Sequence, residues 1–233
     1  LLRPSVRRIV GQPKPVFRLR DVFREHKVIL VPLNEALVGP ITAQLLGGLI
    51  VAECWAATLE RAIEHEPAKR PASLWVDEAQ NFLSLPISLD SALNASRSMG
   101  VSWHLAHQFR AQLPPAMAAA VDSNARNKLV FRPNDPKDAA ASARQAPELQ
   151  DVDFLTLPKY TAYATLVVDG ASQPWCSLTT LPPPEPTGLG TRIRDTSRAT
   201  YGTRPTPPTS PEATDLPTSG SGPVGRKPRR RQP

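Results

Sequence analysis

Two adjacent carboxylates, Asp77 and Glu78, follow a short apolar run and are the residues of this chain best placed to do chemistry. The run Leu74-Trp75-Val76, which comes shortly after Pro71, indicates a buried central strand. Ligands of open parallel sheets bind beyond the carboxyl ends of the strands, so both acids would emerge where chemistry is expected. One carboxylate can hold Mg²⁺, and the second can orient or polarise an attacking water, which suits nucleotide hydrolysis. A strand that ends in a solvated acidic turn would contain the same residues.

Further polar residues are expected along the same edge of the sheet. Arg97 lies near the end of a helix predicted over residues 89–98, and His107 and Gln108 close the strand that follows. Each has a simpler explanation, because a cation at a helix C-terminus also stabilises the helix dipole, and polar side chains can simply cap a strand. His104 is expected on the opposite face of its strand, in a structural role.

Strand and helix patterns alternate from residue 27 to about residue 145, which indicates an α/β fold with a mostly parallel sheet flanked by helices. The β-branched run 27–33 predicts a buried strand, and Gly39 and Pro40 open a long helix. The apolar face of this helix is expected to contain Ile41, Leu45, Leu49, Ala52, Ala56 and Leu59. Its glycines, Gly47 and Gly48, are expected to allow close packing against a neighbour. The remaining predicted elements are helices over 114–121 and 135–144, strands over 101–106, 127–131, 160–168 and 174–179, and a hairpin turn at Asp169-Gly170.

The 233 residues carry a formal net charge of +7 that is concentrated at the two ends. Residues 1–27 hold eight Lys or Arg against two Asp or Glu, residues 181–233 hold nine against four, and the middle holds eleven against fifteen. The charge therefore does not indicate a basic nucleic-acid-binding surface on the folded body. Residues 181–233 also hold twelve of the 27 prolines, so this segment is expected to be disordered. Its basic end, Arg226 to Arg231, is either a solubilising tail or a cluster that attracts nucleic acid or anionic lipid.

Three parts are expected: a basic connector over residues 1–26, a folded body over 27–180 and a disordered tail over 181–233. Cys54 and Cys176 form no Cys-x-x-Cys pattern, so neither a disulfide framework nor a cysteine metal site is expected. The longest apolar stretch, Leu45 to Leu59, is interrupted by Glu53, and we expect it to be too short to span a bilayer. A reduced, cytoplasmic setting fits these features.

The acidic strand and the segments after it resemble the RecA-like motors of the HerA–FtsK superfamily, and most closely the TraG/TraD-like coupling ATPases of conjugation and type IV secretion. The order and spacing of four segments carry this resemblance, which covers roughly residues 27–180. Residues 74–82 look like the Walker B strand, 95–101 like the arginine-bearing segment, 105–108 like the sensor motif and 124–132 like the next strand.

The resemblance implies ATP and Mg²⁺ as ligands and a role for each matched residue. Asp77 would bind Mg²⁺ through water, Glu78 would be the catalytic carboxylate acting on the lytic water, and Gln108 would sense the γ-phosphate. Arg97 would be an arginine finger facing the nucleotide of a neighbouring subunit, with Arg126 as the second candidate. The resemblance also implies a homo-oligomer, in the form of a hexameric ring, that moves DNA. Secretion or relaxosome proteins would be further partners, and an upstream region could hold the motor at the inner face of the cell membrane.

The chain lacks the Gly-x-x-x-x-Gly-Lys-Ser/Thr loop whose amides and lysine cradle the phosphates in such motors. Because the first residue is Leu1 rather than Met, we expect the C-terminal portion of a longer ATPase that has its phosphate loop elsewhere. On its own, this polypeptide is expected neither to bind ATP tightly nor to hydrolyse it.

Two other hypotheses remain open. The first is a non-enzymatic remnant, or a module that binds DNA or a partner through its basic ends. The second is a fragment of a DEAD-box-like helicase, because Asp77-Glu78-Ala79-Gln80 mimics that motif. The lack of a following Ser-Ala-Thr motif, and the order of Arg97 before Gln108, favour the motor over the helicase.

Overall fold

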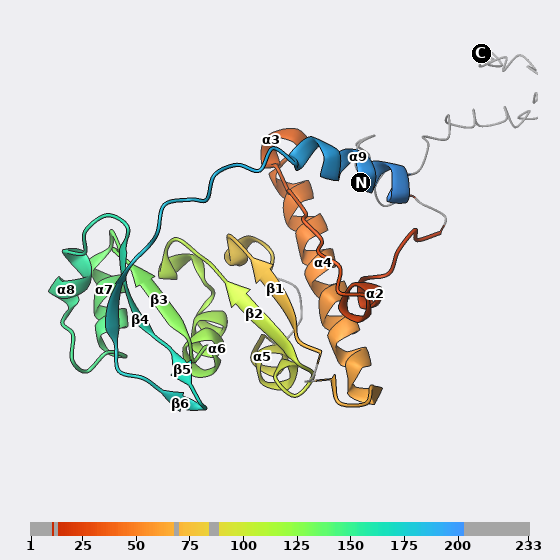
Figure 1. The fold of residues 1–233 in the computed structure, drawn as a ribbon. Helices are drawn as coiled ribbons and strands as arrows, with labels where there is room; N and C mark the ends of the chain where they lie inside the picture. The colour runs from red at the N-terminus through yellow and green to blue at the C-terminus, as the bar shows by residue number, and fades with distance from the viewer. Residues whose placement is uncertain (1–10, 12–13, 68–69, 84–88, 203–233) are drawn as a thin grey trace, which may run out of the picture.

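The computed structural model describes residues 11, 14–67, 70–83 and 89–202. A long helix, α4 (Pro40–Glu60), stands beside a short parallel sheet, and a second sheet with its own helices lies at the far end of the molecule (Figure 1). The predicted basic cluster at residues 226–231 falls outside the described residues.

The parallel sheet consists of β1 (Ala72–Val76) and β2 (Val101–Leu105), joined through α5 (Leu89–Ser96). One face of this sheet packs against α4 through Val51, and α5 and α6 (Pro115–Asn124) extend the same apolar layer. The α/β fold with a parallel sheet and flanking helices is therefore confirmed. The packed face carries the alternate apolar side chains of both strands, namely Leu74, Val76, Val101, Trp103 and Leu105.

The opposite face of the β1–β2 sheet is largely exposed. Trp75 is 74% exposed, and its ring stacks on His104 with centroids 3.7 Å apart and planes within 4°. Ser102 lies within hydrogen-bonding distance of both neighbours on this face, 2.9 Å from Ser73 and 3.2 Å from His104. The expected structural position of His104 on this face is confirmed. A parallel sheet is normally covered on both faces, so a bare face is unusual.

The second sheet is antiparallel and has the order β3-β4-β7, with β3 at Lys128–Phe131, β4 at Thr161–Thr165 and β7 at Cys176–Thr179. The strand predicted over 160–168 is divided, because β5 (Val167–Val168) leaves β4 to pair with β6 (Ala171–Ser172). The predicted turn between them is confirmed, with positive φ at Asp169 and Gly170. Among the described residues, β3 does not join the parallel sheet.

Two helices cover the second sheet. α7 (Pro136–Ala143) forms where residues 135–144 predicted a helix, and Asp135 caps it by accepting a hydrogen bond from the amide of Lys137 at 2.9 Å. α8 (Asp151–Leu155) was not predicted. It buries Phe154 completely, in edge-to-face contact with Tyr163 of β4 and with Trp175.

One sequence-based expectation is wrong, and a second is corrected for part of its length. Residues 27–33 form no strand but an unpaired extended segment, with Val28 85% and Leu30 81% exposed, because no described strand lies alongside to accept their backbone hydrogen bonds. The segment expected to be disordered from residue 181 contains a helix, α9 (Gly190–Tyr201). Its last residue, Tyr201, packs edge-to-face on Phe17 with ring centroids 5.7 Å apart, a long-range contact that composition does not reveal.

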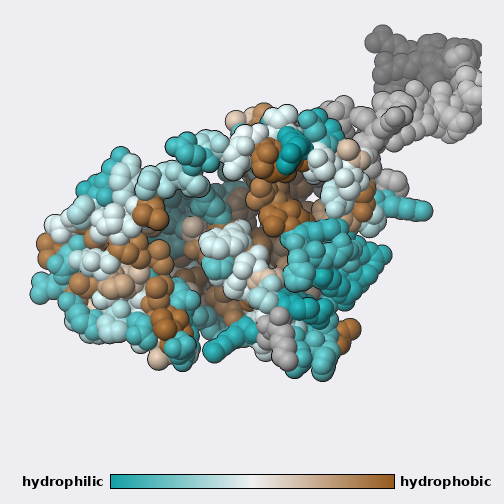
Figure 2. Space-filling model, viewed as in Figure 1, coloured by the Kyte–Doolittle hydropathy of each residue, from teal (hydrophilic) through white to brown (hydrophobic). Residues whose placement is uncertain are grey.

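Helix α4 is confirmed, but its predicted buried face is wrong. Ile41, Leu45 and Leu49 are 81%, 39% and 45% exposed, because the helix is apolar on nearly every side and the face with small residues approaches its neighbours most closely. The exposed apolar surface is visible over the upper half of α4 and the chain before α3 (Glu35–Val38) in Figure 2. The buried positions are Ala43, Leu46, Gly47, Gly48, Val51, Cys54, Ala57 and Thr58.

Together with the 3₁₀ turn η1 (Arg61–Ile63), α4 spans 24 residues. Its length and composition would allow it to cross a membrane, whereas the apolar stretch Leu45 to Leu59 was expected to be too short to do so. It is the only such helix among the described residues, and the core helix of a soluble protein meets the same criteria. Here α4 serves as a scaffold for the sheet.

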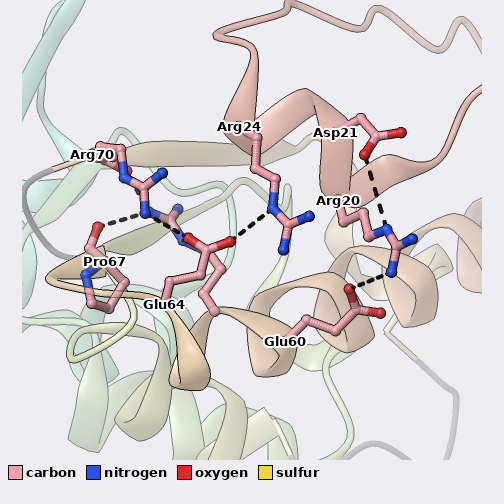
Figure 3. Close-up of polar contacts among 8 residues, drawn as sticks. Arg20, Asp21, Arg24, Glu60, Glu64, Pro67 and Arg70 are labelled. Carbon is pink, nitrogen blue, oxygen red and sulfur yellow. Dashed lines mark hydrogen bonds and ion pairs between the residues drawn. The ribbon is translucent and has the colours of Figure 1, made fainter.

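The N-terminal segment is fastened to α4 by arginines of α2 (Leu19–Arg24), as Figure 3 shows. Arg20 pairs with Glu60 at 3.2 Å, and Arg24 pairs with Glu64 at 2.9 Å. Arg61, only 2% exposed, donates to the carbonyl of Pro67 at 2.7 Å and has its guanidinium over the ring of Phe23 in α2. Burial lowers the pKa of Arg61, although the nearby Glu64 carboxylate opposes that shift.

Substitution of Gly47 should test the close packing of α4. A Cβ atom at this position would lie 2.2 Å from the Phe82 ring and 2.8 Å from the side chain of Leu33, so we expect Gly47→Ala to lower the free energy of unfolding by about 1–3 kcal/mol. Urea denaturation measures this change. Without the clash, the higher helix propensity of alanine would raise the free energy of unfolding by about 1 kcal/mol. The control is Gly190→Ala in α9, where a Cβ atom meets nothing within 4 Å. Equal stability of Gly47→Ala and the parent would contradict the predicted clash.

Candidate functional site

The loops that follow β1 and β2 are joined by backbone hydrogen bonds, so residues beyond the two strands are held side by side. The amide of Ala106 donates to the carbonyl of Val76 at 3.0 Å, and the amide of Ala79 donates to the carbonyl of Ala106 at 2.9 Å. Val76 and Ala79 are buried, at 7% and 2% exposure. The chain leaves this anchored layer at Asp77 and Glu78, which therefore emerge at the carboxyl edge of the sheet, as predicted.

Glu78 occupies a strained backbone conformation. Its φ of 50° and ψ of 46° lie in the left-handed region, which costs a residue with a Cβ about 1–2 kcal/mol. Strain of this kind persists only where the surrounding structure imposes it, and it is common at functional sites. The 3₁₀ turn η3 (Ala79–Asn81) begins directly afterwards and fixes the reversal of the chain.

The carboxylate of Glu78 is clamped between two side-chain amides. Gln80 donates to Oε2 at 2.6 Å, and Gln108, beyond the end of β2, donates to Oε1. The predicted meeting of Glu78 and Gln108 is thus observed. The two amide donors fix the orientation of the carboxylate.

Gln80 was not singled out from the sequence, although it lies in the same acidic stretch. Its Oε1 atom is buried and has no hydrogen-bond partner among the described residues. A buried acceptor without a partner is costly, so this atom marks a place where a donor from water, a ligand or another chain would be favourable.

Asp77 is exposed, and one of its carboxylate oxygens accepts the backbone amide of Glu78 at 3.0 Å. The other oxygen is available to a cation or its water shell, which suits Mg²⁺, because that ion is commonly bound by one or two carboxylates and keeps several waters. No cluster of three or more His, Cys, Asp or Glu side chains able to hold a metal occurs in the described part of the chain. Asp77 alone could therefore contact a hydrated Mg²⁺ through its water shell.

Arg97 does not join this group. It lies in the exposed turn between α5 and β2, with the amide of Gly100 donating to its carbonyl at 3.1 Å. Gln108 follows the opposite end of β2, so at about 3.3 Å per residue over five residues the two edges are roughly 15 Å apart. Arg126, which precedes β3, also lies outside the clamp, and His107 is exposed beside Gln108. Within one chain, Asp77, Glu78 and Gln108 come together and Arg97 stays apart.

No protein-family model matches the chain, and no curated protein matches it. Among solved structures, it is similar to the bacterial conjugative coupling protein TrwBΔN70 in an unbound monoclinic form, at 20% identity over 62% of this chain and 37% of that one, with a TM-score of 0.47. TrwB in complex with the ATP analogue ADPNP gives the same values. TrwB with ADP and Mg²⁺ matches at 21% identity over 62% and 36% of the two chains, with a TM-score of 0.47. The chain thus spans little more than a third of these proteins.

The backbone strain at Glu78 gives a direct test. We expect Glu78→Gly to be more stable than Glu78→Ala by about 1 kcal/mol in urea denaturation, because only glycine adopts φ near +50° without a Cβ penalty. Both variants lose the carboxylate, so the comparison isolates the backbone. At Asp90 in α5 the order should reverse, because alanine is favoured over glycine in a helix by about 1 kcal/mol. An alanine variant at position 78 as stable as the glycine variant would show that the left-handed conformation costs nothing.

Proposed function

We propose that this chain is the C-terminal part of a RecA-like, ATP-driven motor domain of the conjugative coupling type. The contact between Glu78 and Gln108 across the ends of two parallel strands is the observation that supports it most strongly. TrwB has been solved with an ATP analogue and with ADP and Mg²⁺, and we extend ATP and Mg²⁺ to this chain as part of the proposal.

Each residue of the clamp has a task in this proposal. Asp77 holds the hydrated Mg²⁺, which when bound offsets the negative charge that develops on the phosphates. Glu78 accepts a hydrogen bond from the lytic water and orients it toward the γ-phosphate. Gln108 has a second amide hydrogen that can reach a phosphate oxygen, so loss of the γ-phosphate changes how firmly Gln108 holds Glu78.

The phosphate cradle must come from polypeptide outside this sequence. No Gly-x-x-x-x-Gly-Lys-Ser/Thr loop occurs in the 233 residues. In the described part of the chain, the parallel sheet has only two strands and one face bare around Trp75, whereas parallel sheets are stable when further strands and helices complete them. A segment that supplied strand, loop and helix would complete both the sheet and the site.

Arg97 suits a role between subunits. It lies at the edge of the sheet opposite Glu78, outside the clamp of its own chain. In a ring of identical subunits, each chain presents one edge to each neighbour, and Arg97 can then complete the neighbour's site. The proposal accordingly includes a homo-oligomeric ring that moves DNA at the cytoplasmic side of the membrane. The family resemblance implies that this ring is a hexamer.

The basic ends favour a second candidate, a module that binds DNA or a partner without hydrolysis. Besides the charge excess of residues 1–27, the described part of the C-terminal segment has three exposed arginines on α9. This module would be favoured over the motor by two results together. The chain would bind DNA with an affinity that falls as salt rises, and substitution of Glu78 in a longer polypeptide would not change its ATPase rate. The arginines on α9 are Arg192, Arg194 and Arg198.

The motor is tested in a longer polypeptide that carries a phosphate loop ahead of this sequence. Glu78→Gln should lower kcat by roughly 10²-fold or more, and Arg97→Ala by roughly 10³-fold, while both leave ATP affinity within a few-fold of the parent. Steady-state turnover and equilibrium binding of a fluorescent ATP analogue measure the two effects. Arg144→Ala, which removes an exposed arginine at the end of α7, is the matched control and should change neither.

Two outcomes would contradict the motor. Equal loss of binding and hydrolysis in Arg97→Ala would remove the role between subunits. Turnover by the 233-residue chain itself, abolished by Glu78→Gln, would show that the cradle is contained in this sequence after all.

A further inference from the structure

A polar cavity of about 260 Å³ lies at the start of β3, away from the Glu78 clamp. The end of α6, the first residue of β3, the segment just after α7, the end of β4 and strand β6 surround it. Its walls combine two cations, several hydrogen-bonding groups and one aromatic ring. The lining residues that matter here are Asp122, Arg126, Lys128, Gln145, Ser172 and Trp175.

Arg126 is held in place by the hairpin. Its NH2 group donates to the carbonyl of Gly170 at 2.9 Å and contacts the hydroxyl of Ser172 at 3.4 Å. The left-handed turn at Asp169 and Gly170, with φ of 51° and 81°, directs that carbonyl toward the guanidinium. No hydrogen bond joins the Nε and NH1 groups of Arg126 to the described residues, so a fixed guanidinium presents unused donors.

The acid in the wall does not neutralise this cation. Both carboxylate oxygens of Asp122 accept from Arg110, and one also accepts from Gln145 at 3.1 Å. Burial alone would raise the pKa of Asp122, but the hydrogen bonds from Arg110 and Gln145 outweigh it and hold the pKa below its usual value. Asp122 is therefore an ionised group already paired with Arg110 outside the cavity lining.

Lys128 adds a second positive charge. Its ammonium donates to the carbonyl of Asp122 at 3.0 Å and to the side-chain oxygen of Gln145, which leaves one of its three hydrogens unused. Partial burial lowers the pKa of Lys128, and the charge of Asp122 opposes that shift. Because the negative charge of Asp122 is balanced by Arg110, the positive charges of Arg126 and Lys128 can attract an anionic ligand.

We propose that this cavity binds the phosphate group of a nucleotide, with Arg126 as the principal contact and Lys128 as the second. A fixed guanidinium with two free donors matches adjacent phosphate oxygens. The volume exceeds what one phosphate needs, and the ring of Trp175, fixed by its N–H bond to the carbonyl of Gln145 at 2.9 Å, offers a wall for sugar or base. The site uses none of the residues of the clamp at Glu78, so it stands whether or not the chain belongs to a motor.

Isothermal titration of the full 233-residue chain tests this site, with inorganic phosphate, AMP and a 5′-phosphorylated oligothymidylate as probes. We expect AMP to bind the parent and Arg126→Ala to weaken it about ten-fold or more, because a charge-assisted pair is lost. Arg132→Ala, which removes an exposed arginine just beyond the other end of β3, is the matched control and should stay within two-fold, about the error of such a titration. Urea midpoints confirm that both variants are folded.

The three probes also separate the sources of the phosphate. If AMP binds more tightly than inorganic phosphate and Trp175→Ala reduces this difference in affinity, the ligand is a free nucleotide stacked on the ring. If the oligonucleotide binds more tightly than AMP and its affinity falls steeply as the salt concentration rises, the ligand is the backbone of single-stranded nucleic acid. The proposal is overturned if no probe binds at about 10 mM, an affinity too weak for a built site. It is equally overturned if Arg126→Ala binds AMP as well as Arg132→Ala does. Glu78→Gln should leave this binding unchanged, so failure here is distinct from failure of the motor.

Discussion

At the candidate site, the structure depends on one contact, in which the carboxylate of Glu78 accepts a hydrogen bond from the amide of Gln108. The contact exists because two parallel strands end together and deliver their following loops to the same place. Glu78 adopts a left-handed backbone conformation there, and its second carboxylate oxygen accepts a hydrogen bond from Gln80. Backbone strain together with an oriented carboxylate is common at functional sites, which is why the proposed function starts from Glu78.

The surroundings of this contact leave apolar side chains exposed. The parallel sheet leaves Trp75 exposed on one face, and α4 leaves Ile41 and Leu45 exposed although it is the longest apolar helix described. Apolar surface of this extent is stabilised by contact with further protein, and the proposed nucleotide would also need donors for its phosphates. One further segment would meet both needs, because it would cover the apolar surface and supply the phosphate contacts.

Local pattern was sufficient to predict much of this fold, because the apolar run before Asp77 and the turn at Asp169-Gly170 carry their own structural signals. Pairing was not predictable, since the run 27–33 has strand composition but no described strand beside it. The buried face of α4 was also missed, because apolar residues all round the helix leave small residues such as Gly47 to decide which side packs. The meeting of Glu78 and Gln108 was predictable because both follow the ends of neighbouring strands, whereas the contact from Gln80 required coordinates.

The arrangement is tested most directly by mixing two inactive variants of the longer, phosphate-loop-bearing polypeptide, Glu78→Gln and Arg97→Ala. An interface that pairs Arg97 of the first variant with Glu78 of the second is intact, so co-assembled subunits at equal amounts should recover about a quarter of the parent ATPase rate if interfaces act independently. A mixture no more active than the two variants measured separately, with co-assembly shown by size, would contradict a nucleotide site completed across two chains.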